Sequence, residues 1–148
     1  MLLRIARPFA LLLALLCGSA GAHSQAAGVP AYRVIVNPKN PLREIERGKL
    51  SDAFLKKATH WPDGEVIRPV DLPSGAGARK SFTAEVLRRS VPAVKSYWQQ
   101  LIFSGRDIPP PELETDAAVR DFVLQHSGAV GYVSGSAELG KAKVISVR

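Results

Sequence analysis

The 148-residue sequence contains a single cysteine, Cys17, and only three histidines. Cys17 lies in an N-terminal segment that we expect to be removed, so the mature chain has neither a disulfide nor a thiol nucleophile. His23, His60 and His126 are far apart and show no metal-ligand spacing. No Gly-x-Ser-x-Gly elbow surrounds a serine. The sequence therefore predicts no catalytic residue, no metal site and no cofactor, and we expect that the protein is not an enzyme.

The sequence also lacks an apolar run long enough to cross a bilayer, which needs about 20 residues. Its longest apolar stretch starts at Phe9, follows Arg4 and Arg7, and precedes the small residues Ala20-Gly21-Ala22. A basic end, an apolar run of about 7–15 residues and a small-residue site are typical of a secretory signal peptide. We therefore predict a signal peptide over residues 1–22 and a periplasmic mature protein without stable membrane insertion; a membrane anchor is the alternative.

Long runs of like charge are absent. The leader holds two of the 20 Lys and Arg residues, so 18 basic side chains remain against 13 acidic ones. These basic residues are interspersed with acids, and an exported protein would meet little nucleic acid, so we expect no nucleic-acid partner. The excess of positive charge favours at most small anions. An ordinary solvated surface explains this charge better than any specific role does.

Residues 30–148 are long enough for one domain with its own core. Strand-like and helix-like segments alternate along them. Pro69 cannot donate to a ladder, so its strand is expected to lie at a sheet edge or to end there. This alternation predicts an α/β fold, a single domain with a small sheet and helices on its faces. The expected strands are 32–36, 66–70, 129–133 and 143–147, and the expected helices are 42–57, 78–89, one that starts at Pro92, and one that follows Thr115 and ends at Gly128.

The helix that starts at Pro92 has the clearest amphipathic pattern in the chain. Its apolar residues follow the spacing i, i+3, i+4, i+7, i+8. We expect this stripe to pack in the core, and the opposite side of the helix is one possible contact surface. The stripe consists of Val94, Tyr97, Trp98, Leu101 and Ile102.

Five short segments occur in a fixed order along the chain: Val34-Ile-Val-Asn-Pro38, Leu50-Ser-Asp-Ala-Phe54, His60-Trp-Pro-Asp-Gly64, Tyr97-Trp98 with Ile102-Phe-Ser-Gly105, and Gly128-Ala-Val-Gly-Tyr132. In this order they resemble the phosphate-binding family of ABC transporter substrate-binding proteins, over about residues 32–135. The resemblance implies a single lobe of the type II periplasmic-binding-protein fold over residues 30–148. It also implies capture of inorganic phosphate or a related oxyanion, and as partner an ABC transporter permease or another periplasmic protein.

The candidate ligand site is a glycine-containing turn that opens the second expected helix. Free backbone N–H groups and the helix dipole favour an anion at such a place. Ser74 can donate from its hydroxyl, and glycines let the backbone come close to a ligand. Arg79 can make a forked, charge-assisted contact with phosphate oxygens. The predicted phosphate-binding residues are Ser74, Gly75, Ala76, Gly77, Arg79 and Arg68.

Phosphate binders of the family that the chain resembles carry Ser-Gly-Thr at this loop, with an arginine shortly before it. Ser74 and Gly75 match that pattern, Ala76 replaces the threonine, and Arg68 lies further upstream than the pattern implies. The family closes two lobes around its ligand, whereas this chain has the length of one. The resemblance therefore implies weak or partner-dependent binding. The alternative is a single-lobe periplasmic interaction module that has lost ligand binding, with Ser74 as a capping residue and Arg79 as a solvated cation.

Overall fold

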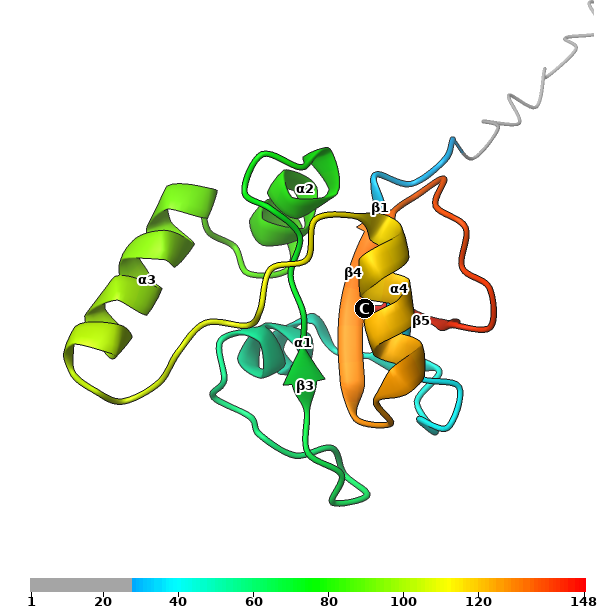
Figure 1. Ribbon diagram of the computed structural model, residues 1–148, viewed down its shortest axis with the longest axis horizontal. Coiled ribbons are helices and arrows are strands. Elements are labelled where there is room, and N and C mark those ends of the chain that lie inside the picture. Colours follow the sequence, from blue (N-terminus) through cyan, green and yellow to red (C-terminus); the bar gives the residue numbers. More distant parts are fainter. Residues whose placement is uncertain (1–27) are drawn as a thin grey trace, which may run out of the picture.

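The structure, a computed structural model, describes residues 28–148, and the predicted signal peptide lies outside them. The described residues form five strands and four helices that alternate as the sequence predicts (Figure 1). In chain order these are β1 (Tyr32–Val36), β2 (Glu44–Ile45), α1 (Arg47–Phe54), β3 (Arg68–Pro69), α2 (Gly77–Glu85), α3 (Val91–Phe103), α4 (Asp116–Gln125), β4 (Ala129–Ser134) and β5 (Lys143–Val147).

The strands form one mixed sheet in the order β2-β5-β1-β4-β3. The central strand β1 pairs antiparallel with β4 and β5, and the two short outer strands pair parallel with their neighbours. Val34 lies opposite Tyr132 on one side and Ile145 on the other. This register makes β1 the middle of the core, because its last three residues are buried.

Helices cover both faces of the sheet. A Cβ added to Gly131 of β4 would meet Val119 and Val123, so this face packs against α4. Successive side chains of a strand point to opposite faces, so the next residue, Tyr132, points toward α1 and α2. There its ring stacks on that of Phe82, with centroids 4.0 Å apart. Figure 1 shows the same arrangement, with α4 on one side of β4 and with α1 and α2 on the other.

The first two predicted helices are shorter in the structure. The segment expected as helix 42–57 begins with β2, because Ile45 pairs with Val147, and α1 covers only Arg47–Phe54. Lys56, just after α1, has a left-handed backbone with φ 53°. The helix expected over 78–89 is Gly77–Glu85, and Arg88 beyond it also has positive φ. At both places a left-handed residue follows the end of a helix that the apolar spacing alone predicts to continue.

The remaining elements agree more closely with expectation. Thr115 caps α4 by accepting from Ala118 N, although α4 ends at Gln125 and not at Gly128. The strand expected over 66–70 has regular pairing only at Arg68–Pro69, and it lies at the edge of the sheet, as Pro69 requires. β5 has the predicted bounds. Within residues 28–148 no helix is both long and apolar enough to span a bilayer.

The amphipathic helix α3 buries only part of its apolar stripe. Ser90 caps it, and Pro92 lies in its first turn. Val94 and Trp98 are buried, and the Tyr97 hydroxyl donates to the Leu55 carbonyl oxygen at 2.9 Å. Ile102, by contrast, is 49% exposed. The C-terminal end of α3 therefore lies outside the core, as its position at the edge of Figure 1 also shows.

Candidate functional site

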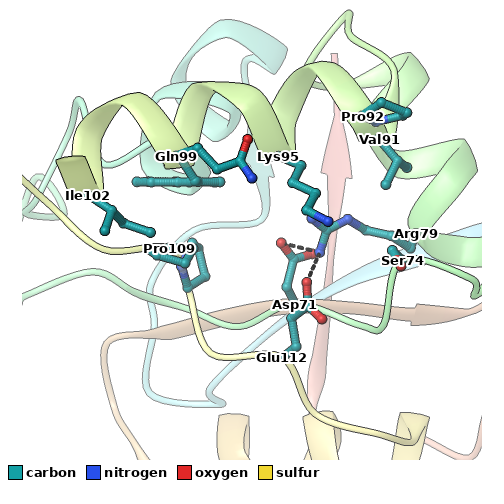
Figure 2. Close-up of a pocket in the computed structure, with 12 residues that line it drawn as sticks. Asp71, Ser74, Arg79, Val91, Pro92, Lys95, Gln99, Ile102, Pro109 and Glu112 are labelled. Carbon is teal, nitrogen blue, oxygen red and sulfur yellow. Dashed lines mark ion pairs between the residues drawn. The ribbon is translucent and has the colours of Figure 1, made fainter.

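A pocket of about 600 Å³ lies between α3, the loop that leads into α2, and the connector before α4 (Figure 2). Its lining has equal shares of polar and apolar side chains. The polar ones are Asp71, Ser74, Arg79, Lys95, Gln99 and Glu112, and the apolar ones are Val91, Pro92, Trp98, Ile102, Pro109 and Pro110.

The floor of the pocket is built where β3 ends. Asp71 follows this strand and forms an isolated parallel bridge with Glu112. In this bridge Asp71 N donates to the Pro111 carbonyl oxygen and Leu113 N donates to the Asp71 carbonyl oxygen, both at 2.9 Å. These two bonds hold the proline-rich connector beside the strand. The connector thereby brings Glu112 and two prolines to the pocket from a distant part of the sequence.

The loop between β3 and α2 leaves the start of α2 without a side-chain cap. Ala76 N donates to the Pro73 carbonyl oxygen at 2.9 Å, so Ser74 and Gly75 lie in a tight turn. The N-cap residue is Ala76, which offers no capping oxygen, and Ser74 makes no capping contact. A Cβ added at Gly75 or Gly77 would meet open space. The first backbone N–H groups of α2 therefore lack a side-chain cap, as expected for the start of a helix that binds an anion.

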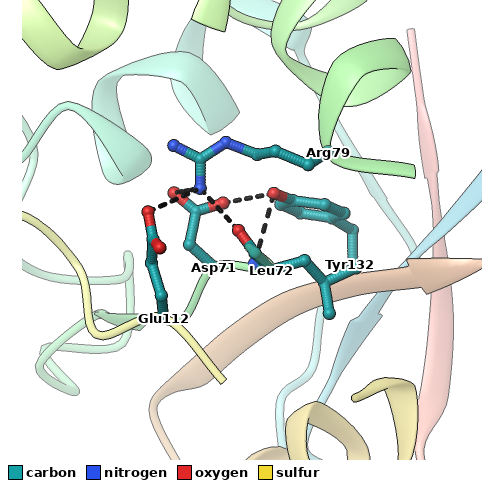
Figure 3. Close-up of polar contacts among 5 residues, drawn as sticks. All are labelled: Asp71, Leu72, Arg79, Glu112 and Tyr132. Atoms are coloured by element: carbon teal, nitrogen blue, oxygen red, sulfur yellow. Dashed lines mark hydrogen bonds and ion pairs between the residues drawn. The ribbon is translucent and has the colours of Figure 1, made fainter. Parts of the chain in front are cut away.

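Arg79 is buried, with only 5% of its surface exposed, and is not a solvated cation. Its Nη1 forms an ion pair with Asp71, lies 3.8 Å from a Glu112 carboxylate oxygen and donates to the Leu72 carbonyl oxygen at 3.0 Å (Figure 3). All of these contacts are made by one nitrogen. Nε, on the opposite edge of the guanidinium, is buried without a hydrogen-bond partner. The solvated arginine of the alternative interpretation is thus wrong, and one edge of Arg79 keeps unused donors.

Asp71 links Arg79 to the sheet. The Tyr132 hydroxyl donates to its carboxylate, so β4, β3 and α2 meet at this one side chain. Burial raises the pKa of Asp71 to about 6, although Arg79 and the Tyr132 hydrogen bond favour the charged form and act in the opposite direction. Burial and the neighbouring carboxylate raise the pKa of Tyr132 as well. Tyr132 is therefore a neutral donor at any physiological pH.

Lys95 is a pocket residue that the sequence interpretation missed. It extends from α3 toward the side of the pocket where Arg79 lies (Figure 2). The sequence could have revealed the face of α3 that carries Lys95. Residues at spacings of four, four and three lie on one side of a helix, and these spacings connect Val91, Lys95, Gln99 and Ile102. Asp71, Glu112 and Tyr132 were also missed. They come together only through the sheet and the connector, for which the sequence carries no local pattern.

The predicted ligand residues are only partly brought together. Ser74 and Arg79 line the pocket, whereas Gly75, Ala76 and Gly77 form the turn between them without lining it. Arg68 is exposed on the edge strand and does not line the pocket. Among the described residues, no group of three or more His, Cys, Asp or Glu side chains could hold a metal ion.

No protein-family model and no curated protein matches the chain. Solved structures do match. An ABC-type phosphate transport receptor from Vibrio cholerae has a TM-score of 0.61 and 20% identity, over 79% of this chain and 46% of the receptor. A phosphate ABC transporter substrate-binding protein with bound phosphate, from Clostridium perfringens, has a TM-score of 0.62 and 17% identity, over 79% and 44% of the two chains. PstS from Borrelia burgdorferi has a TM-score of 0.60 and 12% identity, over 80% of this chain and 47% of PstS.

The present chain spans less than half of the length of each of these proteins. The matched part contains the mixed sheet and helices described above. The resemblance that the ordered sequence segments predict is therefore confirmed for the fold: residues 28–148 have the α/β architecture of about one lobe of a phosphate ABC transporter substrate-binding protein.

Proposed function

We propose that the protein binds inorganic phosphate or a related oxyanion in the pocket between α3 and the start of α2. The observation that carries this proposal is the state of Arg79, which is buried, lines the pocket and uses only Nη1 in its contacts with the protein. A buried donor without a partner costs about 1–3 kcal/mol. An anion bound at the guanidinium edge that includes Nη2 would accept hydrogen bonds from Arg79 donors that do not bind the protein.

The charges of the pocket decide which groups attract the anion. The charge of Arg79 is largely balanced by Asp71, since the two side chains are paired and buried. Lys95 and the open N-terminus of α2 therefore supply the net attraction, and Ser74 adds a neutral hydroxyl donor. Glu112, whose side chain is 52% exposed, repels an anion weakly because solvent screens it. The same charge balance predicts modest affinity.

In this proposal the turn contributes backbone rather than side chains. Gly75 and Gly77 offer N–H groups beside the helix start, whereas Ala76 N already donates to the Pro73 carbonyl oxygen, and the missing threonine hydroxyl at Ala76 removes one donor. Arg68 is not included, because it is exposed on the edge strand and does not line the pocket. The resemblance to transport receptors supports phosphate among the oxyanions, since those receptors are named for that ligand.

The experiment that tests this proposal is isothermal titration calorimetry of the protein with inorganic phosphate. We expect saturable binding that weakens at least tenfold in Ser74→Ala combined with Lys95→Gln. Absence of heat and of thermal stabilisation at millimolar phosphate would exclude inorganic phosphate as the ligand. Chloride at equal ionic strength is the control, because it adds charge without the oxygens that Ser74 and Arg79 would contact.

We also propose that the protein is exported and acts in the periplasm with an ABC transporter permease or another periplasmic protein. The basic, apolar and small-residue order of residues 1–22 and the fold of the transport receptors support this proposal. N-terminal sequencing of the protein from a periplasmic extract tests it. We expect His23 as the first residue. An intact Met1 in a cytoplasmic fraction would contradict export.

Exposed apolar side chains favour a second candidate function, that of a single-lobe interaction module. Phe103 is 90% exposed and Ile108 is 65% exposed, and both lie near the C-terminal end of α3. Exposed apolar patches often mark protein interaction sites. A pull-down from the periplasm with and without phosphate separates the two functions. The module predicts a partner that Phe103→Ser loses and that phosphate does not affect.

A further inference from the structure

The charged side chains of the pocket define a polar end, and the end opposite to it is mainly apolar. Figure 2 shows Ser74 and Arg79 at the polar end, beside Val91 and Pro92, and it shows Ile102 and Pro109 facing each other at the apolar end, where Gln99 is the neighbouring polar residue. The Lys95 side chain extends from α3 toward Arg79. An oxyanion seated at the polar end would leave the wall formed by Ile102 and Pro109 without a partner.

The dimensions of the pocket exceed those of a free oxyanion. Val91 and Ile102 both line it from α3, and at about 1.5 Å per residue their positions are roughly 16 Å apart along the helix axis. The volume of about 600 Å³ falls within the range of about 300–1,000 Å³ that is typical of sites for organic ligands. Ile102 is 49% exposed although it lines this cavity, so contact with a ligand would remove apolar surface from water.

We propose that the ligand is an oxyanion that carries an apolar organic group, a phosphonate or a phosphate monoester, and not the free inorganic ion alone. The phosphoryl oxygens occupy the end with Ser74, Arg79 and Lys95. The organic group lies along α3 against Ile102 and Pro109. This inference rests on the proposed oxyanion function of the same pocket, and it names the class of ligand that fills the remainder.

A graded series of ligands tests the inference. Inorganic phosphate, methylphosphonate and phenylphosphonate share the oxyanion and differ in the apolar group, and the carbon–phosphorus bond excludes hydrolysis during the titration. We expect calorimetry of the protein to show affinity rising along the series, with phenylphosphonate at least about tenfold tighter than phosphate. The reason is that, of the three ligands, the phenyl group extends furthest from the oxyanion toward the apolar end of the pocket.

Two neighbouring residues provide a variant and its matched control. Ile102→Ser removes apolar surface from the pocket wall, while Phe103→Ser removes an exposed side chain that does not line it. We expect Ile102→Ser to reduce the preference for phenylphosphonate over phosphate to less than about threefold. Phe103→Ser should leave this preference unchanged. Circular dichroism confirms that each variant is folded.

The possible outcomes distinguish the inference about the ligand class from the proposed oxyanion function. Equal affinity for phosphate and phenylphosphonate would overturn the inference and leave the oxyanion function standing. A preference for phenylphosphonate that Ile102→Ser does not change would overturn the assignment of the apolar end. Binding of phenylphosphonate without binding of phosphate would support the ligand class and exclude the free ion. Failure of all three ligands to bind would overturn both proposals.

Discussion

Arg79 and Asp71 form an ion pair in which both side chains are almost completely removed from solvent, with exposures of 6% and 7%. Arg79 lies in the first turn of α2, and Asp71 lies two residues after the end of β3, so the pair joins a helix to the edge of the sheet. Tyr132 of β4 adds a third element through its hydrogen bond to Asp71. Asp71, a side chain of the candidate site, therefore also connects α2 and β4 to the segment that follows β3.

Removal of Asp71 is expected to destabilise the protein strongly. Asp71→Ala leaves Arg79 as a buried, uncompensated charge, which costs about 3–5 kcal/mol in the free energy of unfolding. Urea denaturation measures this loss. The matched control is Asp121→Ala, which breaks the more exposed pair with Arg120 and should cost less than about 1 kcal/mol. Similar losses in both variants would contradict the structural role of the buried pair.

The raised pKa of Asp71 predicts a pH dependence of stability. The folded chain holds the proton up to about pH 6, whereas the unfolded carboxyl releases it near 3.8. Between these values the folded state binds more protons, so the contribution of Asp71 to stability is lost as pH rises from about 4 to about 6. We expect a decrease of about 1–3 kcal/mol over this window.

The variant Asp71→Asn isolates this contribution, because an amide does not titrate in the window. Denaturation of the protein and the variant should be compared at pH 4, 5, 6 and 7. The difference in unfolding free energy should change between pH 4 and 6 and stay constant above. An identical slope in both proteins would show that another group causes it.

Sequence patterns predicted the elements of the fold better than their ends. Apolar spacing indicated α3, and the N-cap at Thr115 was correctly placed. The ends of α1 and α2 were missed, because the left-handed residues Lys56 and Arg88 are neither glycine nor asparagine, which such positions usually favour. The pairing of Ile45 with Val147 joins residues too distant for any local pattern.

A smaller part of the candidate site than of the fold was predicted from the sequence, again because contacts between distant residues leave no local pattern. Ser74 and Arg79 are near each other in sequence and could be found from a turn before a helix. Lys95 and Glu112 reach the same pocket from α3 and the connector, which the backbone hydrogen bonds of Asp71 hold in place. The burial of Arg79 is likewise a tertiary property. No spacing in the sequence distinguishes it from a solvated arginine.

Two glycines should respond differently to substitution by alanine. In Gly131→Ala the new Cβ would lie 2.7 Å from a Val119 methyl carbon and 2.9 Å from one of Val70. We expect a loss of about 1–3 kcal/mol from this overpacking between β4 and α4. Gly75→Ala meets open space and should keep the stability of the parent. Thermal denaturation measures both, and a neutral Gly131→Ala would contradict the described packing.

Lysines of two different pockets provide a test of where an anion binds. Lys95 lines the pocket of the candidate site, and Lys39 lines another pocket beside the C-terminal end of α4. A hydrogen bond to a charged group contributes about 1.5–3 kcal/mol, so Lys95→Gln should weaken phosphate binding about tenfold or more. Lys39→Gln should leave the affinity unchanged. Calorimetry of both variants at low salt checks this, and the reverse result would place the anion in the other pocket.

The most direct test of the central claim is a titration of the isotope-labelled protein with inorganic phosphate, followed by the amide resonances in two-dimensional NMR spectra. If the anion binds at the start of α2, the backbone amides of residues 74–79 should shift in a saturable way together with those around Lys95. The resonances near Lys39 and Lys141 should not move. Saturable shifts confined to another surface, or no shifts at millimolar phosphate, would contradict the account.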